Sequence, residues 1–535
     1  MSPGGFQRRT QSGIILGQRI AELRGDHDFL YELPEDRSPF VRIRLLTCMF
    51  PLSAHELFPI LGGMTTATPS TTAHLTSRNP TTGKVHDTYP ETPDATIDTR
   101  LGNADRAYRE TLLHKPDDLI AARSRMLRHA AAVLEAGVDK YAAIMTREMG
   151  KPFESAKTEV IKCAKCCRYY AEHGPAMLKP ESAKLSTGAS AEIRHEPLGV
   201  VLAVMPWNFP FWQVIRCAAP ILLSGNSYIL KHASNVPESA LAIESVFHEA
   251  FQREKLNPDA FATFLIPSSR IEKLIADRRI RGVTLTGSEG AGRKVAAAAG
   301  AQLKKTVLEL GGSDPFIVFP TADLEKAITT AVEARMLSNG QSCIAAKRFL
   351  IHESLYGKFR DGLVEKFKAY KMGDPMLPET KLGPIAGEKN RADLHALVTD
   401  ATANGAKIVL GGEIPSGNGY FYPATIIESI PEKARLYREE AFGPLASLYR
   451  FETHDEMLTL ANAPAYGLGA SIWTAEDHEI ELCARRVESG QLFVNGLVAS
   501  DPGIPFGGVK DSGYGRELGI YGIREWTITR TIVKA

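Results

Sequence analysis

The chain has 535 residues, of which 44% are hydrophobic, and its 63 basic and 62 acidic side chains leave a formal net charge of +1. A chain of this length exceeds one typical domain, so two or three large domains are expected. The balanced charge argues against a nucleic-acid or membrane-surface partner. No apolar run approaches the roughly 20 residues needed to span a bilayer. These properties predict a soluble protein that acts on a small molecule.

Seven cysteines are scattered along the chain. Their odd number, without a secretory leader, predicts reduced thiols and a cytoplasmic location. Cys163, Cys166 and Cys167 could suggest a metal site, but no second Cys or His pair lies at ligand spacing. The helical pattern around them favours three cysteines on a helix, and no metal is expected.

Residues 1–70 mix short apolar runs with charged stretches, which favours a disordered extension. The early arginines resemble a mitochondrial presequence, although the acidic residues that follow weaken this alternative. Met64 precedes a Thr-rich polar stretch at residues 65–72 and is a candidate for the functional start of the protein.

Apolar residues recur at helical spacing from about residue 100 to 178. Strands and helices then alternate, with strands expected at 199–205, 228–230 and 283–286 and a helix opening near Pro237. A second unit follows, with strands expected at 315–319 and 348–351 and a helix between them. This alternation predicts an α/β protein with two Rossmann-like parallel-sheet halves.

Three short motifs fit one reaction: Pro-Trp-Asn-Phe-Pro at 206–210, Glu-Leu-Gly-Gly at 309–312 and Gly-Gln-Ser-Cys at 340–343. A cysteine thiolate can attack an aldehyde carbonyl, a side-chain amide can hold the oxyanion, and a carboxylate can activate water. Cys343, Asn208 and Glu309 are the candidates for these roles.

In these motifs, and in their order and spacing, the chain from about Asn79 onward resembles the aldehyde dehydrogenase superfamily. Further matching segments are 287–292, 439–444 and 505–513. The Gln-Ser-Cys-Ile-Ala-Ala-Lys-Arg run at 341–348 resembles the bacterial type of the succinate-semialdehyde dehydrogenase branch. The resemblance implies oxidation of an aldehyde to a free acid through a cysteine thiohemiacetal and thioester, with NAD or NADP as cofactor.

The same resemblance implies a domain organisation. Residues 71–179 and 196–308 are expected to form an NAD(P)-binding domain, and residues 309–519 a catalytic domain. Residues 180–195 and 520–535 correspond to a small β arm that pairs with a neighbouring subunit in the family. An exposed strand edge is costly to leave unpaired, so a homodimer or homotetramer is expected.

The catalytic candidates have physical support besides the resemblance. Cys343 follows the turn-prone Asn339-Gly340 pair, and a thiol with an ordinary pKa of about 8.5 needs nearby donors or positive potential to ionise. The apolar neighbours of Glu309 predict a raised pKa, which suits a general base and favours hydrolysis over transfer to coenzyme A. Residues 344 and 345 lack sulfur, so no redox disulfide at the nucleophile is expected.

The cofactor site is predicted around Gly287 and Ser288, where a strand gives way to a helix whose N-terminus can face a phosphate. The resemblance adds four residues as cofactor contacts: Trp207, Lys231, Glu440 and Phe442. Ser234 stands where strictly NAD-using relatives often place a glutamate that repels a 2′-phosphate. A hydroxyl beside Lys231 predicts that NADP is accepted as well as NAD.

Substrate identity is predicted from Arg216, eight residues after Asn208. Succinate-semialdehyde dehydrogenases use an arginine at this position for the distal carboxylate, and a guanidinium suits that contact. Trp212 and Ser500 are further candidates for the substrate pocket. A second arginine of animal-type members is replaced by Leu337. Succinate semialdehyde is therefore the predicted substrate.

Three alternatives stay open at this stage. The enzyme could act on another aliphatic or pathway-specific aldehyde, it could be a coenzyme A-acylating type, or it could be a catalytically silent relative with a structural or binding role. Cys343 and Glu309 are both present, which argues against the silent relative.

Overall fold

The computed structural model describes residues 73–534. The predicted extension at 1–70 and the Met64 start lie outside these residues. The described chain begins with a hairpin that the sequence did not reveal, β1 (His74–Arg78) paired antiparallel with β2 (Val85–Pro90). Helices α1 (Asp94–Thr111), α2 (Pro116–Ala136), α3 (Val138–Met149) and α4 (Phe153–Met177) follow, where helical spacing had been found.

A six-stranded sheet forms the first half, in the order β19-β9-β8-β5-β6-β7. Its strands are β5 (Val200–Met205), β6 (Ser227–His232), β7 (Phe261–Thr263), β8 (Ile280–Thr286), β9 (Lys305–Glu309) and β19 (Gly513–Tyr514). Strands β5 to β9 are parallel, and the helices α5 (Trp212–Leu223), α6 (Pro237–Arg253), α7 (Ile271–Ala276) and α8 (Glu289–Ala301) connect them. The predicted parallel α/β half is thus present, with the short antiparallel strand β19 added at its edge.

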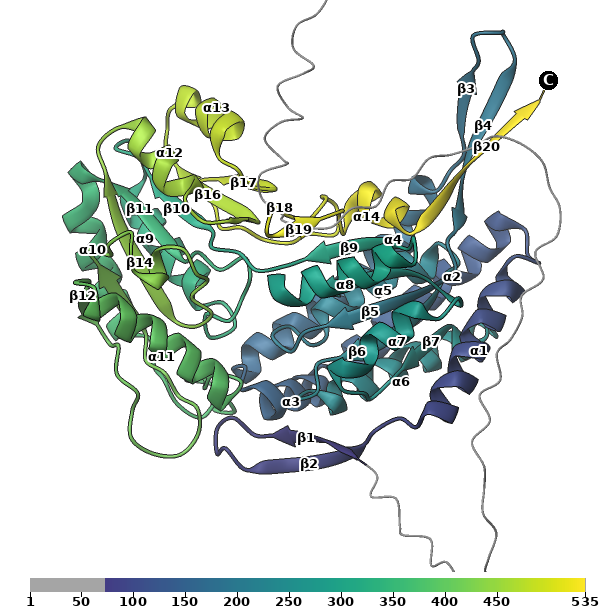
Figure 1. The fold of residues 1–535 in the computed structure, drawn as a ribbon, viewed down its shortest axis with the longest axis horizontal. Helices are drawn as coiled ribbons and strands as arrows, with labels where there is room; N and C mark the ends of the chain where they lie inside the picture. The colour runs from purple at the N-terminus through teal and green to yellow at the C-terminus, as the bar shows by residue number, and fades with distance from the viewer. Residues whose placement is uncertain (1–72, 535) are drawn as a thin grey trace, which may run out of the picture. The chain divides into compact units, whose positions relative to one another are not determined.

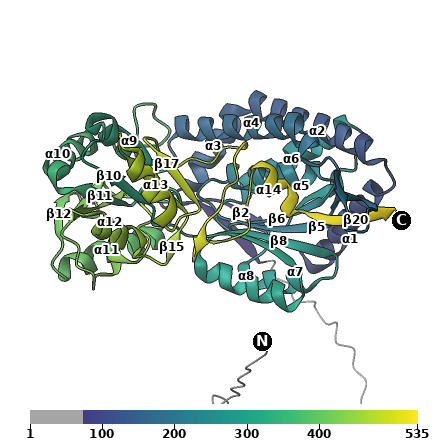
Figure 2. The ribbon, with the colours of Figure 1, turned by 90° about the horizontal axis from the view of Figure 1, so that it is seen from above.

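Strand β5 shows why this sheet is covered on both faces. Its six residues are all buried, because side chains alternate between faces and each face meets helices. Val201 and Ala203 belong to the core shared with α2, α4, α5 and α6, whereas Val200 and Leu202 belong to the core shared with α1, α7 and α8. Figure 2 shows the two helix layers, with α2, α4 and α6 on one side of the sheet and α7 and α8 on the other.

A seven-stranded sheet forms the second half, in the order β12-β13-β14-β11-β10-β16-β17. Its strands are β10 (Pro315–Val318), β11 (Arg348–His352), β12 (Lys407–Leu410), β13 (Thr425–Glu428), β14 (Leu445–Phe451), β16 (Gly469–Trp473) and β17 (Gln491–Val494). Only β12 runs antiparallel to its neighbour. Helices α9 (Leu324–Met336) and α10 (Glu353–Lys368) share one core with this sheet, and α11 (Glu388–Ala403), α12 (His454–Asn462) and α13 (Asp477–Arg486) share the other.

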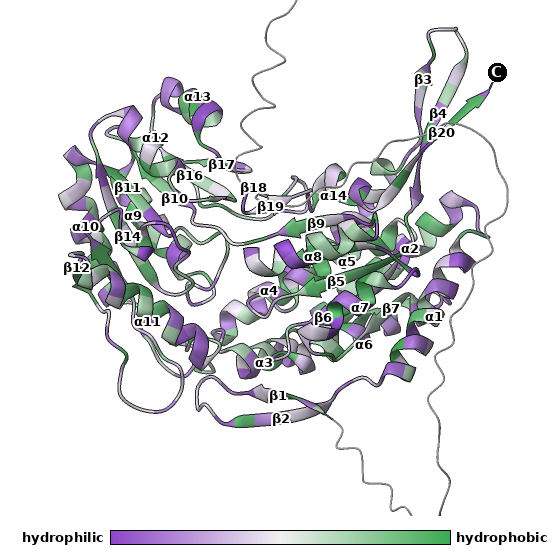
Figure 3. Cartoon of the chain, in the orientation of Figure 1, coloured by the Kyte–Doolittle hydropathy of each residue, from purple (hydrophilic) through white to green (hydrophobic). Residues whose placement is uncertain are grey.

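A separate three-stranded antiparallel sheet has the order β20-β4-β3. It joins β3 (Glu181–Lys184) and β4 (Ser190–Pro197) to β20 (Thr527–Lys534), which follows helix α14 (Gly519–Glu525). In Figure 1 this sheet extends beyond the helices of the first half. Figure 3 shows a mixture of polar and apolar residues along it, whereas the strands of the two large sheets are mostly apolar.

Element boundaries differ from the sequence-based ones in small ways. The strand β4 continues to Pro197, beyond the expected end of the arm, and β20 begins at Thr527, after a helix that occupies the expected start of the arm. Strand β9 ends at Glu309, so the expected domain boundary falls at the last residue of a strand of the first sheet. A strand of two residues, β15 (Tyr466–Gly467), pairs with β18 (Val509–Lys510) and completes the described strands.

Candidate active site

Cys343 lies in the segment between α9 and β11, directly after a tight turn. Ser338, Asn339 and Gly340 have φ values of 54°, 60° and 73°, a left-handed conformation that is costly for non-glycine residues. A Cβ atom on Gly340 would lie 2.4 Å from the backbone carbon of Gly443, so only glycine fits there. This turn fixes the position of Cys343.

Asn339 holds the turn through its side-chain amide. The Nδ2 group donates to the carbonyl oxygens of Gly150 at 2.9 Å and Pro384 at 3.0 Å, and Oδ1 accepts from the N–H of Gly383 at 2.8 Å. A fully satisfied buried amide offsets backbone strain, which explains how an asparagine is tolerated in this conformation.

Arg335 supports the same turn from α9. Its fully buried guanidinium donates to the carbonyl oxygens of Ala346 at 3.0 Å, Gly340 at 2.6 Å and Ala441 at 3.3 Å, and also to that of Gly443. This arginine therefore ties the nucleophile segment to the 441–443 segment of the second half.

Two cavities meet at Cys343. The first, here called the α8 cavity, has a volume of about 260 Å³ and is lined by Pro206, Trp207, Asn208, Gln213, Thr286, Gly287, Ser288, Leu310, Gly311, Cys343, Asn390, Glu440 and Phe442. The second, here called the α4 cavity, has a volume of about 230 Å³ and is lined by residues of α4 and α5 and of the 497–506 segment. Cys343 and Gln213 line both cavities, so the thiol is accessible from two sides.

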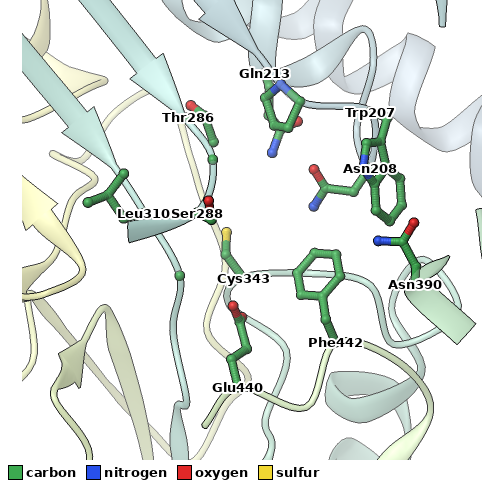
Figure 4. Close-up of a pocket in the computed structure, with 13 residues that line it drawn as sticks. Trp207, Asn208, Gln213, Thr286, Ser288, Leu310, Cys343, Asn390, Glu440 and Phe442 are labelled. Atoms are coloured by element: carbon green, nitrogen blue, oxygen red, sulfur yellow. The ribbon is translucent and has the colours of Figure 1, made fainter. Parts of the chain in front are cut away.

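The α8 cavity lies where the order of the first sheet reverses. The chain places β6 and β7 on one side of β5 and then crosses to place β8 and β9 on the other. The loops after β5 and β8 part at this point, and ligands of parallel α/β sheets bind in the crevice outside such strand ends. Trp207 and Asn208 come from the loop after β5, and Ser288 from the turn after β8 (Figure 4). Gly287 precedes Ser288 in the same turn and also lines the cavity.

Ser288 caps α8, because its hydroxyl accepts the N–H of Ala291 at 3.4 Å. The positive end of this helix therefore lies beside the cavity, a suitable place for a phosphate group. Trp207 and Phe442 pack edge to face on the opposite wall, with ring centroids 5.8 Å apart. These four observations (a switch point, a capped helix end, an aromatic wall and an adjacent thiol) fit a dinucleotide cofactor.

Glu440 and Lys347 are paired beside the thiol. Lys347 Nζ lies 3.0 Å from Glu440 Oε1 and donates to the carbonyl oxygens of Ser342 at 2.9 Å and Cys343 at 2.7 Å. Glu440 also accepts the N–H of Gly312 at 3.2 Å. Lys347 comes from the 341–348 motif, and it places a buried cation next to the nucleophile.

Burial dominates the ionisation of Cys343. It raises the pKa of the thiol to about 12, against the opposing effect of the nearby cations Arg216 and Lys347. The thiol is therefore neutral at neutral pH. Positive potential was expected to favour its ionisation, but the two cations that supply it here do not outweigh burial. Attack on an aldehyde requires transfer of the thiol proton to a base.

Asn208 is buried at the wall shared with the nucleophile segment. Its side-chain Nδ2 donates to the carbonyl oxygen of Gln341 at 2.9 Å, and its backbone carbonyl oxygen accepts the hydroxyl of Ser338 at 3.1 Å. An amide carries two N–H groups, so one of them is left for an oxyanion. His232 secures the same loop by contacting the carbonyl oxygens of Met205 at 3.2 Å and Pro210 at 2.9 Å.

Glu309 ends β9 with a side chain that is 2% exposed, and it lines neither cavity. Neither carboxylate oxygen has a hydrogen-bond partner within residues 73–534. Burial, together with the nearby Glu517 carboxyl, raises the pKa of Glu309 well above its usual range, while Arg216 and Arg516 oppose this shift. A carboxylate in this setting is a stronger base than an exposed one.

The α4 cavity contains all three predicted substrate residues, Trp212, Arg216 and Ser500. Trp212 Nε1 donates to Ser500 Oγ at 3.0 Å. Arg216 is already paired, since its Nε lies 2.5 Å from Glu517 Oε2 and its terminal nitrogen donates to Thr286 Oγ1 at 3.3 Å. The sequence indicated the arginine but not its buried partner. Leu337 lines the cavity as an apolar residue.

Lys231 and Ser234, predicted for the cofactor, line neither cavity. Lys231 stands in β6 opposite Val204 of β5 and is 3% exposed. Its ammonium forms no hydrogen bond or ion pair within the described part of the chain. Burial lowers the pKa of Lys231 to about 8. A buried cation with no internal partner fits the binding of an external anion or hydroxyl.

Several residues of the two cavities were not predicted. Gln213 lines both, Asn390 from α11 lines the α8 cavity, and Lys162 from α4 lines the α4 cavity. No spacing in the sequence links them to Cys343, because each reaches the site from another element. Cys163 and its two neighbouring cysteines lie on α4 as predicted, and the cysteines described in the structure are free.

In the described range, the group of side chains that could hold a metal ion is His454, His478 and Glu479, outside both cavities. None of the helices in residues 73–534 combines the length and apolar character needed to cross a membrane.

Comparison with known proteins agrees with this fold. Residues 67–532 match the model of the aldehyde dehydrogenase family. A succinate-semialdehyde dehydrogenase [NADP(+)] of Mycobacterium avium is 48% identical over 85% of this chain and 95% of its own length. A Mycobacterium tuberculosis protein of the same name is 47% identical over 85% and 98% of the two chains.

Two solved structures have the same fold as this chain. The succinic semialdehyde dehydrogenase of Streptococcus pyogenes, in complex with NADP+, superimposes with a TM-score of 0.82 at 36% identity and covers 86% of this chain and 99% of its own. The succinate-semialdehyde dehydrogenase of Burkholderia pseudomallei has a TM-score of 0.82 at 30% identity, over 86% and 95% of the two chains. The fold and site define an α/β oxidoreductase with a cysteine between two cavities. The chain belongs to the aldehyde dehydrogenase family.

Proposed function

We propose that this protein oxidises succinate semialdehyde to succinate with NAD(P)+ and that it accepts NADP. The observation that carries the proposal is the position of Cys343 between two cavities, one suited to a dinucleotide and one that contains cationic side chains. The names of the similar proteins supply the substrate and the NADP preference as support.

The α8 cavity would hold the cofactor. The N-terminus of α8 at Gly287 and Ser288 would face its phosphates, Trp207 and Phe442 would flank its rings, and Glu440 would accept from a ribose hydroxyl. Lys231 and Ser234, at the carboxyl end of β6, would contact the adenine ribose, and the absence of a glutamate at 234 removes a barrier to a 2′-phosphate. On this assignment the first sheet and its helices form the cofactor domain, and the second carries the nucleophile.

Cys343 Sγ would attack the aldehyde carbon after losing its proton to solvent, and the new carbon–sulfur bond would turn the carbonyl oxygen into an oxyanion. Asn208 Nδ2 and the N–H of Cys343 would hold this oxyanion, which is worth about 3 kcal/mol per donor. The bound cofactor supplies the acceptor for the hydride that leaves the former aldehyde carbon. Cys343 is then left as a thioester.

Glu309 would take a proton from water, whose oxygen attacks the thioester carbon and breaks its bond to sulfur; Glu309 would then return the proton to the Cys343 thiolate. Each cycle therefore consumes one aldehyde, one water and one oxidised cofactor, and it yields one carboxylic acid, one reduced cofactor and one proton. The raised pKa of Glu309 makes it an effective proton acceptor once it is ionised. Its side chain would have to turn toward Cys343, since it lines neither cavity.

The test compares succinate semialdehyde with butanal, an uncharged aldehyde of the same chain length, by the absorbance of the NAD(P)H formed. The proposal expects a large kcat/KM preference for the charged aldehyde. Equal values would indicate that another aldehyde is the substrate. Turnover that depends on coenzyme A would indicate that the acyl group is transferred to coenzyme A instead of being hydrolysed.

The β20-β4-β3 sheet would assemble the chain into a homodimer or homotetramer. Both outer strands, β3 and β20, have one edge without a partner within the described residues, and such edges favour pairing with another chain. Light scattering on the purified protein tests this, because a monomer would contradict it. The cytoplasmic location stays a prediction, and the mitochondrial alternative depends on residues outside the described range.

A further inference from the structure

Three side chains with formal charges line the α4 cavity: Glu159, Lys162 and Arg216. A substrate carboxylate entering this cavity meets whichever positive charge is not already balanced. The partners of each charged group therefore decide which residue can bind it.

Glu159 is fully engaged by its own surroundings. Its Oε1 accepts the N–H groups of Phe211 and Trp212, each at 3.0 Å, and its Oε2 forms a buried ion pair with Lys151. Lys151 in turn lies 3.8 Å from the ring centroid of Phe209. The Glu159 charge is thus balanced and does not compete for a cation in the cavity.

Arg216 has its charge balanced as well. Glu517 lies 2.5 Å from its Nε, and both side chains are almost fully buried, with 3% and 1% of each side chain exposed. Moving Arg216 away from Glu517 would leave a buried carboxylate unpaired, which is strongly unfavourable. Arg216 can add a hydrogen bond to a ligand, but it does not bring an uncompensated charge.

Lys162 differs from Glu159 and Arg216 in the partners of its charged group. Its Nζ donates to the neutral hydroxyl of Ser500 at 2.8 Å and lies 4.1 Å from the ring centroid of Trp212. No carboxylate within 73–534 forms an ion pair with it. An ammonium has three N–H donors, so at least one is left for a ligand. Ser500 and Trp212 position the ammonium at the cavity wall, and the Trp212 ring partly offsets its desolvation.

We infer that Lys162 binds the distal carboxylate of the substrate and is the main determinant of selection for an aldehyde acid, an assignment that rests on the proposed function. The hydroxyl of Ser500, which already accepts from Lys162 and Trp212, is placed to donate its proton to the same carboxylate. Cys343 lines the same cavity, so a short aldehyde acid can present its carbonyl to the thiol while its carboxylate contacts Lys162.

The experiment uses the full chain with saturating NADP+ and compares kcat/KM for succinate semialdehyde and butanal. Lys162→Met keeps the length of the side chain and removes the charge. We expect a loss of about 10- to 100-fold for the semialdehyde, carried mainly by KM, and a change within about twofold for butanal. Lys162→Arg keeps a cation and should retain most of the preference. Lys165→Met, on the exposed face of the same helix, is the matched control and should match the wild type.

The outcomes separate the two proposals. A wild-type preference for the semialdehyde that persists in Lys162→Met overturns the assignment of Lys162 and leaves the proposed function standing. A wild-type enzyme without this preference contradicts the proposed function, and the assignment of Lys162 with it.

A second test needs no variant and applies even if Lys162→Met folds poorly. Burial, with a contribution from Arg216, lowers the pKa of Lys162 to about 8. Lys162 is then charged below this pH and neutral above it, while the substrate carboxylate stays ionised. The ratio of the two kcat/KM values should therefore fall as the pH rises through about 8 to 10. A ratio that stays constant over this range overturns the assignment.

Other groups around Lys162 do not produce this change. Glu159 and Arg216 are held in ion pairs, and burial raises the pKa of the Cys163 and Cys166 thiols well above their usual range, so they stay neutral. Titration of Cys343 affects both aldehydes, and it cancels in the ratio.

Discussion

The two cavities that meet at Cys343 differ in how they are built. The α8 cavity uses backbone features of a parallel sheet, namely the loops after β5 and β8 and the capped end of α8. The α4 cavity uses side chains on helix faces, with a mostly apolar wall and a few charged groups. A fold thus provides a general cofactor site at its strand ends, while the substrate site depends on individual side chains. Changes in one cavity should therefore affect one ligand, and changes at the shared thiol should affect the whole reaction.

The largest effect is expected at the shared thiol. Cys343→Ala removes the nucleophile and should lower kcat by about a thousandfold or more, while the dissociation constant of NADP+ changes little. Calorimetry and steady-state rates measure the two quantities. Cys483→Ala, which removes a buried thiol from α13, is the control and should keep its activity. Full turnover in Cys343→Ala would contradict the assignment of Cys343 as the nucleophile and with it the roles proposed for both cavities.

The turn that places Cys343 should matter for stability. Gly340→Ala would adopt a φ of 73° with its Cβ 2.4 Å from the carbon of Gly443, so we expect a loss of about 3 kcal/mol or more in the free energy of unfolding. Gly357→Ala in α10 is the matched control, since its Cβ would meet no atom within 4 Å and should stabilise the helix slightly. Chemical denaturation compares them, and equal stability of the two variants would contradict the role given to the turn.

Asn208→Ala tests the wall of the α8 cavity beside the nucleophile segment. Loss of one oxyanion donor should lower kcat about 100-fold for succinate semialdehyde and for butanal alike, because the oxyanion is common to both. Steady-state kinetics with each aldehyde measures this. A loss confined to one aldehyde would place Asn208 among the residues that select the substrate.

A smaller effect is expected on the cofactor side. Ser234→Glu introduces a carboxylate that repels a 2′-phosphate, and kcat/KM for NADP should fall about 10-fold or more while that for NAD falls less. Ser234→Ala removes only the hydroxyl and should lower kcat/KM for NADP less than Ser234→Glu does. The preference between the two aldehydes should be the same in all three enzymes. A changed aldehyde preference would show that the two cavities are coupled.

These regions also differ in how far the sequence predicts them. The strands β5 and β10 are evident from short apolar runs, because both faces of their sheets are buried. Ser288 is recognisable as a cap since it follows a strand and precedes a helix. Less of the α4 cavity could be predicted from the sequence. Arg216 is predicted to bind the substrate carboxylate, but its pairing with Glu517, from a distant segment, is not evident from the sequence. Lys162 looks like any lysine on an amphipathic helix until the fold places it beside Ser500.

The most direct test of the central claim is to trap the covalent intermediate. Glu309→Gln removes the carboxylate proposed to activate water, so reaction with succinate semialdehyde and NADP+ should stop at the thioester after one burst of NADPH. Peptide mass spectrometry of the quenched enzyme should then find the succinyl group on Cys343 and on none of the other cysteines. A burst without an adduct, or an adduct on another residue, would contradict the account.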